Sequence, residues 1–358
     1  MSAGDGQGSL RRANAGVDEM TRSLVGRFQV QLGVRRMLVL VVVAFVVFAA
    51  LNPRVFLSLL NLQNIAVAAP EVGVMAIAMM LAMLTGGIDL SIVAIANLTA
   101  ITISTMYTAS GSSGERLTPA ILLAGLAVAV VGGLVNGLLV SRVGITPILA
   151  TLATMQIFNG VAVVWTGGRT LYGVPTTLSS TGQATVGGVP VLFVIFVLVA
   201  LGVGVLINRT PLGHKIQLQG ANPTAAAYSG ISSRRTLMGT YLMTGLLAGI
   251  AGILIVARNP TASADYGTSY TLLVIVIAVL GGTNPNGGFA TVMGVVLATL
   301  TLQIVSSGFM AMRWSPYQYA VAQGLILIVV MVSDQIRLRR RRGAPVTPVG
   351  PAPSPTPV

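Results

Sequence analysis

Long apolar runs separated by short polar stretches dominate the 358-residue chain. Uncharged runs near 20 residues are long enough to cross the hydrocarbon core of a bilayer as helices. The pattern therefore predicts an all-α polytopic membrane protein. About ten candidate spans are expected, at residues 37–51, 65–84, 90–108, 120–141, 145–166, 190–207, 237–257, 270–282, 289–307 and 318–334. The eighth run is short enough to be re-entrant.

The positions of lysine and arginine predict the orientation of these spans, because cytoplasmic loops retain basic residues. If the N-terminus is inside, the outer loops hold only Arg54, Arg116, Arg169, Arg258 and Arg313 of the 21 basic residues. This asymmetry predicts ten spans with both termini cytoplasmic, in a bacterial plasma membrane.

Three segments are expected along the chain. Residues 1–36 form a cytoplasmic leader. This leader is too long, and the span that follows it too firmly apolar, for a signal peptide, so we expect an uncleaved first helix. Residues 37–334 form the membrane domain, with a cytoplasmic loop at 208–236. Residues 335–358 form a basic and then Pro-rich cytoplasmic tail, whose composition from residue 343 onward is typical of disorder.

Composition narrows the classes of function. Hydrophobic residues make up 54% and charged residues 8% of the chain, whereas soluble domains carry roughly 25% charged residues. The net charge of +13 is scattered and concentrated at the ends, with no basic domain large enough to hold a duplex, which argues against nucleic-acid binding. No cysteine and a single histidine argue against disulfides, thiolate nucleophiles and zinc. We expect no cofactor, metal or catalytic site in this chain.

The run Leu-Thr-Gly-Gly-Ile-Asp-Leu-Ser at 84–91 interrupts two apolar stretches. Gly86 and Gly87 allow the backbone to turn or to approach a neighbour closely, and Asp89 is costly in hydrocarbon unless it faces protein or water. Gly86, Gly87, Asp89 and Ser91 are therefore candidates for a pathway or gate.

A second glycine-rich junction, Leu-Gly-Gly-Thr-Asn-Pro-Asn-Gly-Gly at 280–288, lies late in the chain. Paired interruptions in the two halves are typical of repeat-built transporters near their pathway, which makes Gly281 and Gly282 further candidates. The alternative is a tight turn at the membrane edge, which the Asn-Pro-Asn-Gly chemistry favours.

Glu71 follows Pro70 inside the second predicted span. Pro70 removes a helix hydrogen bond and can kink the chain, so this position could shape a pathway or gate. In the alternative, Glu71 lies near the outer headgroups and needs no partner.

The cytoplasmic loop 208–236 contains the segment Gly-Ala-Asn-Pro-Thr-Ala-Ala-Ala-Tyr-Ser-Gly-Ile at 220–231. Asn222 can cap a helix, Pro223 suits its first position and Gly230 can end it, so one short helix is predicted between two spans. It is either a docking helix for a partner or an ordinary interfacial helix. The only lysine, Lys215, lies between histidine and isoleucine, so the chain lacks a P-loop and any ATP-driven transport needs a separate ATPase.

Four motifs give the chain a family resemblance. Residues 86–91 (Gly-Gly-Ile-Asp-Leu-Ser), 220–231, 246–252 (Leu-Leu-Ala-Gly-Ile-Ala-Gly) and 280–283 (Leu-Gly-Gly-Thr) match, in order and spacing, the permease subunits of bacterial sugar ABC importers of the ribose/xylose/galactose type. The chain departs from the usual pattern at Ile92-Val93, where Val-Gly is common, and at 284–286.

The resemblance implies a pair of permeases, identical or different, each joined to a cytoplasmic ATPase that uses ATP and magnesium. It further implies an extracytoplasmic binding protein that delivers a monosaccharide or related neutral polyol. It also implies a coupling helix formed by Asn222, Pro223, Ala226, Ala227, Ser229 and Gly230. The thin inventory of acids in the spans, with no cationic array, favours a neutral solute. An ion-coupled secondary transporter using Glu71 or Asp89 is the alternative, whereas one histidine, no cysteine and isolated acids argue against a membrane-embedded enzyme.

Overall fold

The computed structural model describes residues 33–315, 317–319, 321–322, 324–325 and 328. Eight helices among them are long and apolar enough to cross a membrane. These are Gly33–Leu51, α3 (Leu59–Leu84), α4 (Ile92–Ala109), α5 (Thr118–Leu138) with its π-helical continuation η2 (Leu139–Val143), α6 (Pro147–Thr166), α8 (Val191–Arg209), α11 (Ser233–Arg258) and α13 (Val292–Ala311). The prediction of an all-α polytopic membrane protein is confirmed.

Shorter elements connect these helices. The eighth predicted span is α12 (Tyr270–Leu280), which has only 11 residues. The remaining helices are α2 (Pro53–Phe56), η1 (Gly111–Ser113), α7 (Thr176–Gln183), α9 (Pro211–Ala221) and α10 (Pro223–Tyr228). Two short antiparallel ribbons pair β1 (Leu171–Tyr172) with β4 (Thr261–Ala262) and β2 (Thr185–Val186) with β3 (Val189–Pro190).

Two sequence predictions need revision here. The loop 208–236 holds two helices rather than one, because Thr210 caps α9 by accepting a hydrogen bond from the Gly213 N–H at 3.2 Å and Pro211 follows at the first position. α3 begins six residues earlier than predicted and continues through Pro70 as one helix. Most of the tenth predicted span, the leader before residue 33 and the tail 335–358 lie outside the described residues.

The chain divides into two compact units, Met1–Trp314 and Ser315–Val358. In the second unit, the described residues include a turn in which the Ser315 N–H donates to Gln318 Oε1 at 2.8 Å. All helices and strands named above belong to the first unit.

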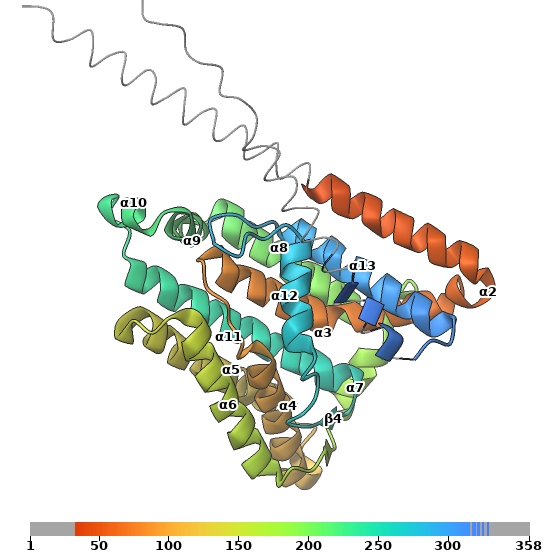
Figure 1. Cartoon of the computed structure of the whole chain (residues 1–358). Helices are drawn as coiled ribbons and strands as arrows, with labels where there is room; N and C mark the ends of the chain where they lie inside the picture. Colours follow the sequence, from red (N-terminus) through yellow and green to blue (C-terminus); the bar gives the residue numbers. More distant parts are fainter. Residues whose placement is uncertain (1–32, 316, 320, 323, 326–327, 329–358) are drawn as a thin grey trace, which may run out of the picture. The chain divides into compact units, whose positions relative to one another are not determined.

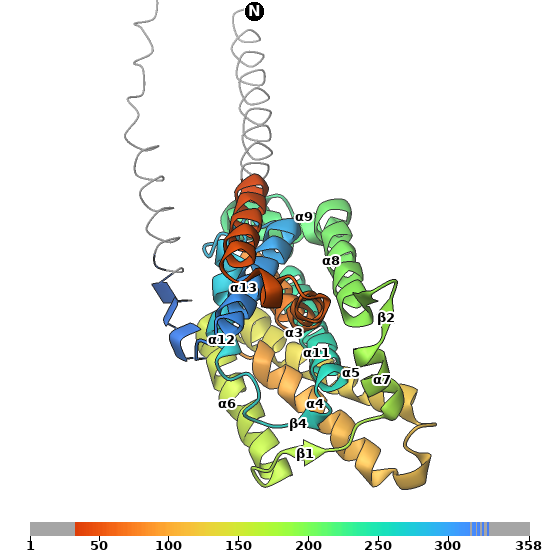
Figure 2. The same cartoon turned by 90° about the vertical axis from the view of Figure 1, so that its right-hand side faces the viewer.

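Helices α3, α4 and α11 form the buried centre of the first unit, whereas the first span, α6 and α8 expose most of their apolar side chains, as lipid-facing helices do. Figure 1 shows α3 and α11 crossing the middle, and Figure 2 shows α8 at the edge. Glycines allow α5 and α11 to approach each other closely. A Cβ on Gly245 would lie 2.7 Å from the Gly133 Cα, and one on Gly249 would lie 2.6 Å from the Ala129 Cβ.

Successive loops alternate between two ends of the first unit. At one end, the end of α3 contacts both the end of α9 and the α12–α13 turn; we call this the α10 end. At the other, the α7 end, β1 pairs with β4 and α7 contacts the end of α11. Since α9 and α10 carry the predicted cytoplasmic loop, the prediction assigns the α10 end to the cytoplasm.

One carboxylate caps α7 from a neighbouring loop at the α7 end. Glu115 accepts hydrogen bonds from the Thr176 backbone N–H at 2.5 Å and the Thr176 hydroxyl at 2.8 Å. These bonds, with the Thr176 N–H as the main cause, lower the pKa of the Glu115 carboxyl to about 2. The contact orients the α6–α8 connection beside the α4–α5 loop.

Candidate functional site

The break between α3 and α4 places Asp89 inside the protein, fully buried. Gly86 starts the break with a positive φ of 81°, which a residue with a side chain rarely adopts. Gly87 lies against the Tyr241 hydroxyl and the Pro147 ring, where an added Cβ would lie 2.8 and 3.0 Å away. The break therefore turns tightly against α6 and α11, and the predicted cost of exposing Asp89 to lipid is avoided.

Neutral donors satisfy both carboxylate oxygens of Asp89. Oδ1 accepts from the Ser91 N–H at 3.1 Å and the Ser91 hydroxyl at 2.6 Å, and Oδ2 accepts from the Thr244 hydroxyl at 2.8 Å. Asn136 extends this network. Its amide nitrogen donates to Ser91 Oγ at 2.7 Å, and its Oδ1 accepts from the Thr154 hydroxyl at 2.6 Å. It joins the break to α5, α6 and α11, which is the arrangement of a structural anchor.

Glu71 is the second buried acid, at 1% exposure, in the middle of α3. Arg258 Nη1, at the end of α11, donates to Glu71 Oε1 at 2.6 Å. Glu71 therefore has a charged partner, which contradicts the part of the alternative in which it needs none. The Arg258 side chain is one-third exposed, so the pair lies at the boundary between the protein interior and the α7 end.

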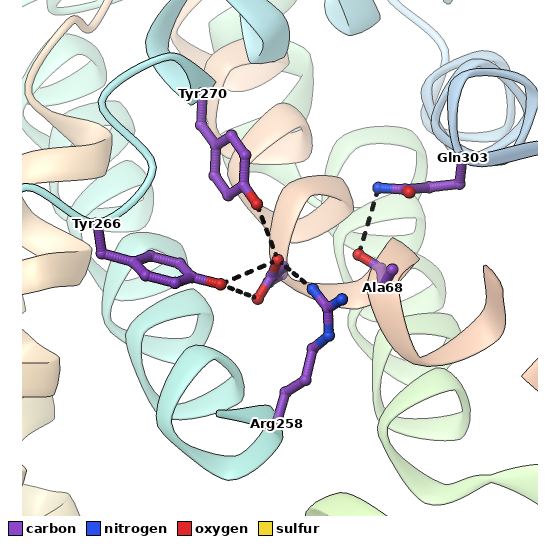
Figure 3. Close-up of polar contacts among 6 residues, drawn as sticks. Ala68, Arg258, Tyr266, Tyr270 and Gln303 are labelled. Atoms are coloured by element: carbon purple, nitrogen blue, oxygen red, sulfur yellow. Dashed lines mark hydrogen bonds and ion pairs between the residues drawn. The ribbon is translucent and has the colours of Figure 1, made fainter. Parts of the chain in front are cut away.

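Two tyrosines complete the shell around Glu71, as Figure 3 shows. The Tyr266 hydroxyl lies 3.2 Å from Oε2 and the Tyr270 hydroxyl lies 3.2 Å from Oε1. Their rings meet edge to face with centroids 6.0 Å apart. The carboxylate thus has one cationic and two neutral donors, which fix it in place and compensate its charge.

A cavity of about 460 Å³ with a mostly apolar lining opens beside this cluster, between α3 and α13. Its polar lining residues are Asn61, Asn64, Arg258, Gln303 and Ser307. The Gln303 amide donates to the Ala68 carbonyl at 3.4 Å, and the Ser307 hydroxyl donates to Asn61 Oδ1 at 2.7 Å. Amides and hydroxyls can bind the hydroxyl groups of a neutral solute.

The short helix predicted in the cytoplasmic loop is α10. Asn222 caps it by accepting a hydrogen bond from the Ala225 N–H at 3.0 Å, and Pro223 takes the first position. Gly230 follows the helix with a positive φ of 77°. Ala226 is buried, whereas Ala227 and Tyr228 are exposed. The exposed residues, Asn222, Pro223, Ala227, Ser229 and Gly230 among them, are the ones that a partner could contact.

The second glycine-rich junction is a turn, as its Asn-Pro-Asn-Gly chemistry favoured. Gly281 caps the end of α12 and lies against the start of α13, where a Cβ would be 2.7 Å from the Val295 Cα. Gly282 has a positive φ of 87° and open space around it. Neither glycine contacts the Asp89 network or the Glu71 cluster in the hydrogen bonds described.

Several residues of both clusters were missed by the sequence analysis. Arg258 was assigned to an outer loop, and Asn136 and Thr244 lie far from Asp89 in sequence. Polar residues inside apolar spans were the available signal, because such residues are rare unless they find a partner. The described residues contain no group of three or more histidines, cysteines or acids that could hold a metal ion.

Comparisons with known proteins show which family this chain belongs to. Residues 61–331 match the model of the family described as branched-chain amino acid transport system / permease component. The ribose import permease protein RbsC of Bacillus subtilis is 32% identical over 81% of this chain and 89% of its own length. The autoinducer 2 import system permease protein LsrD of Shigella flexneri is 32% identical over 85% of this chain and 92% of its own. No solved structure matches the chain significantly.

Proposed function

This chain belongs to the family of permease components of branched-chain amino acid transport systems, and from that premise we propose that it is the membrane subunit of an ATP-driven importer for a monosaccharide or a related neutral polyol. As a permease component with multiple apolar helices, it is a multi-pass protein of the inner membrane and a transport subunit rather than an enzyme. The solute, the energy source and the partners are the proposed part.

The similarity to a ribose import permease and an autoinducer 2 import permease carries the choice of solute class. The chain's own residues agree with it. The lining of the cavity beside α3 is mostly apolar, and its polar residues are three amides, one hydroxyl and Arg258, which is already paired with Glu71. An amino acid would bring a carboxylate and an ammonium group that this lining does not match, whereas a polyol brings hydroxyls that it does.

α10 supports the proposed coupling to an ATPase. ATP and magnesium would bind to that separate subunit, because this chain has no P-loop. A capped helix whose Tyr228 side chain is 91% exposed presents a defined surface at the α10 end. The other proposed partners are a second permease subunit, identical or different, and an extracytoplasmic sugar-binding protein.

Ion coupling through Glu71 or Asp89 receives no support from the geometry. Glu71 is paired with Arg258, and both oxygens of Asp89 are occupied by hydroxyl and N–H donors. A proton- or sodium-coupling carboxylate has to exchange its partner for the ion during each cycle, and neither acid faces an unoccupied ligand set.

Copurification from native membranes in mild detergent, followed by ATPase and uptake assays, tests the proposal. We expect an associated ATPase that is stimulated by a loaded sugar-binding protein, and uptake of labelled pentose that unlabelled leucine does not inhibit. Uptake of leucine but not of pentose would refute the solute class. Full activity without an ATPase would refute the energy source.

A charge on the exposed face of α10 tests the docking role. Ala227→Glu is suitable because Ala227 is exposed, whereas a change at Ala226 would disturb buried packing. We expect Ala227→Glu to insert normally and to lose ATP-dependent uptake at least tenfold. Ser180→Glu, at an exposed position of α7 on the opposite end, is the matched control. Normal uptake by the Ala227 variant would rule out this docking surface.

A further inference from the structure

Three glycine-rich segments meet at the α10 end with their backbones in direct contact. They are the start of the α3–α4 break (84–87), the end of α9 (220–221) and the end of the α12–α13 turn (286–288). The Gly288 N–H donates to the Leu84 carbonyl at 2.9 Å, which joins the first and third segments. We call this contact the glycine junction.

No side chain fits between the three segments. A Cβ on Gly220 would overlap the Leu84 carbonyl and lie 2.6 Å from the Gly288 nitrogen. A Cβ on Gly287 would lie 2.7 Å from the Gly220 carbonyl oxygen and 2.9 Å from the Gly86 nitrogen. Real Cβ atoms essentially never come this close to backbone atoms, so each of these positions requires glycine.

The junction lies where three functional elements begin. Asn222, the cap of α10, comes one residue after Ala221. Asp89 comes three residues after Gly86, and Thr291, which caps α13 by accepting from the Gly294 N–H at 3.2 Å, comes three residues after Gly288. The junction therefore lies within three residues of the α10 cap, of Asp89 and of the α13 cap.

We infer that the glycine junction transmits movement of α9 and α10 to the α3–α4 break and to the α12–α13 turn, with Gly220 and Gly287 as positioning residues. At an ordinary helix interface, changes of side-chain rotamer can absorb a displacement. Where backbone contacts backbone directly, no side chain lies between the segments to absorb it. The three segments move as one body, and Gly282, with its positive φ and open space around it, lies just before that body where a hinge is needed. This inference rests on the proposed coupling of α10 to an ATPase.

Alanine substitutions with matched controls test the inference. Gly220→Ala is compared with Gly204→Ala in α8, where a Cβ meets open space. Gly287→Ala, with a φ of 93°, is compared with Gly144→Ala, which has a φ of 84° but no neighbour within 4 Å. The second comparison separates the close approach from backbone strain.

The readouts are the amount of protein in the membrane, the ATPase retained on purification, ATP hydrolysis, and sugar uptake per ATP in vesicles. We expect both junction variants to retain the ATPase and to hydrolyse ATP, while uptake per ATP falls at least tenfold relative to the controls. Uptake per ATP equal to that of the controls would overturn the inference. Failure of the wild-type complex to couple hydrolysis to sugar uptake would instead refute the proposed function.

Hydrogen exchange of the wild-type complex keeps the inference testable if the junction variants do not accumulate. The Gly288 amide, bonded to Leu84, should stay equally protected in the nucleotide-free and the vanadate-trapped complex, because the segments move together. A tenfold or larger increase of exchange at this amide on trapping would show that the junction opens during the cycle and would overturn the inference.

Discussion

Substitution of Asp89 distinguishes an anchor from a gate. Asp89 is fully buried and accepts three hydrogen bonds, from the Ser91 N–H, the Ser91 hydroxyl and the Thr244 hydroxyl. Asparagine keeps one oxygen for both Ser91 donors. Its new amide can donate to Thr244 Oγ1, whose own hydrogen can turn to the Tyr241 carbonyl at 3.0 Å. Asp89→Asn therefore preserves the number of hydrogen bonds.

The magnitudes follow from counting the donors left without an acceptor. For Asp89→Asn we expect a loss of about 1 kcal/mol or less, the net value of one ordinary hydrogen bond. Asp89→Leu leaves the buried Ser91 N–H and hydroxyl without their acceptor. At about 1–3 kcal/mol for each unsatisfied buried group, the expected loss is about 2–6 kcal/mol.

The assay combines the amount of each variant in the membrane, its melting temperature in detergent, and ATP-dependent uptake. We expect Asp89→Asn to resemble the wild type in all three and Asp89→Leu to be depleted from the membrane. Normal abundance and melting of Asp89→Asn with no uptake would refute the anchor interpretation, because only the charge would then have been lost. Normal abundance of the leucine variant would show that the hydrogen-bond network does not stabilise the fold.

Three further predictions concern other contacts. Glu71→Leu should lower the free energy of unfolding by about 2–3 kcal/mol, which is below the range for a fully buried pair because the arginine partner is one-third exposed. Glu71→Gln should lower it less. Melting temperatures rank the two variants, and equal melting temperatures would contradict this prediction. Gly245→Ala should cost about 1–3 kcal/mol through overpacking, whereas Gly202→Ala in open space should not destabilise, and the same assay compares them. The pKa of Glu115 is lowered on folding from 4.5 to about 2, so its stabilising contact is complete above pH 4.5 and lost as the pH falls toward 2. The difference in melting temperature between wild type and Glu115→Gln should shrink over that window, and a constant difference would exclude the mechanism.

Local chemistry was predictable from the sequence wherever neighbouring residues determine it. The Asn222 cap, Pro223 at the first position of α10 and the positive φ of Gly230 are examples, since each depends on the chain within a few residues. The turn at 284–287 and the short α12 are two more, because turn chemistry and the length of an apolar run are both read directly.

Tertiary partners were not predictable in the same way. The Glu71 partner lies 187 residues away, in a position that the charge pattern assigned to an outer loop. A one-dimensional charge count treats an arginine at a helix end as exposed, although its long side chain can reach back into the protein. The glycines at 287 and 288 lie in a predicted turn and Gly220 in the predicted cytoplasmic loop, but their shared contact depends on how three segments pack.

The separation of 187 residues between Glu71 and Arg258 also bears on how the chain enters the membrane. At a synthesis rate of roughly 5–20 residues per second, the arginine emerges roughly 10–40 s after the glutamate. During that interval α3 carries an acid whose counter-charge does not yet exist. Until α11 is made, the second span can carry this carboxyl group only if the group is protonated or faces protein or water rather than lipid. A chain truncated before Arg258 leaves the second span without its ion pair.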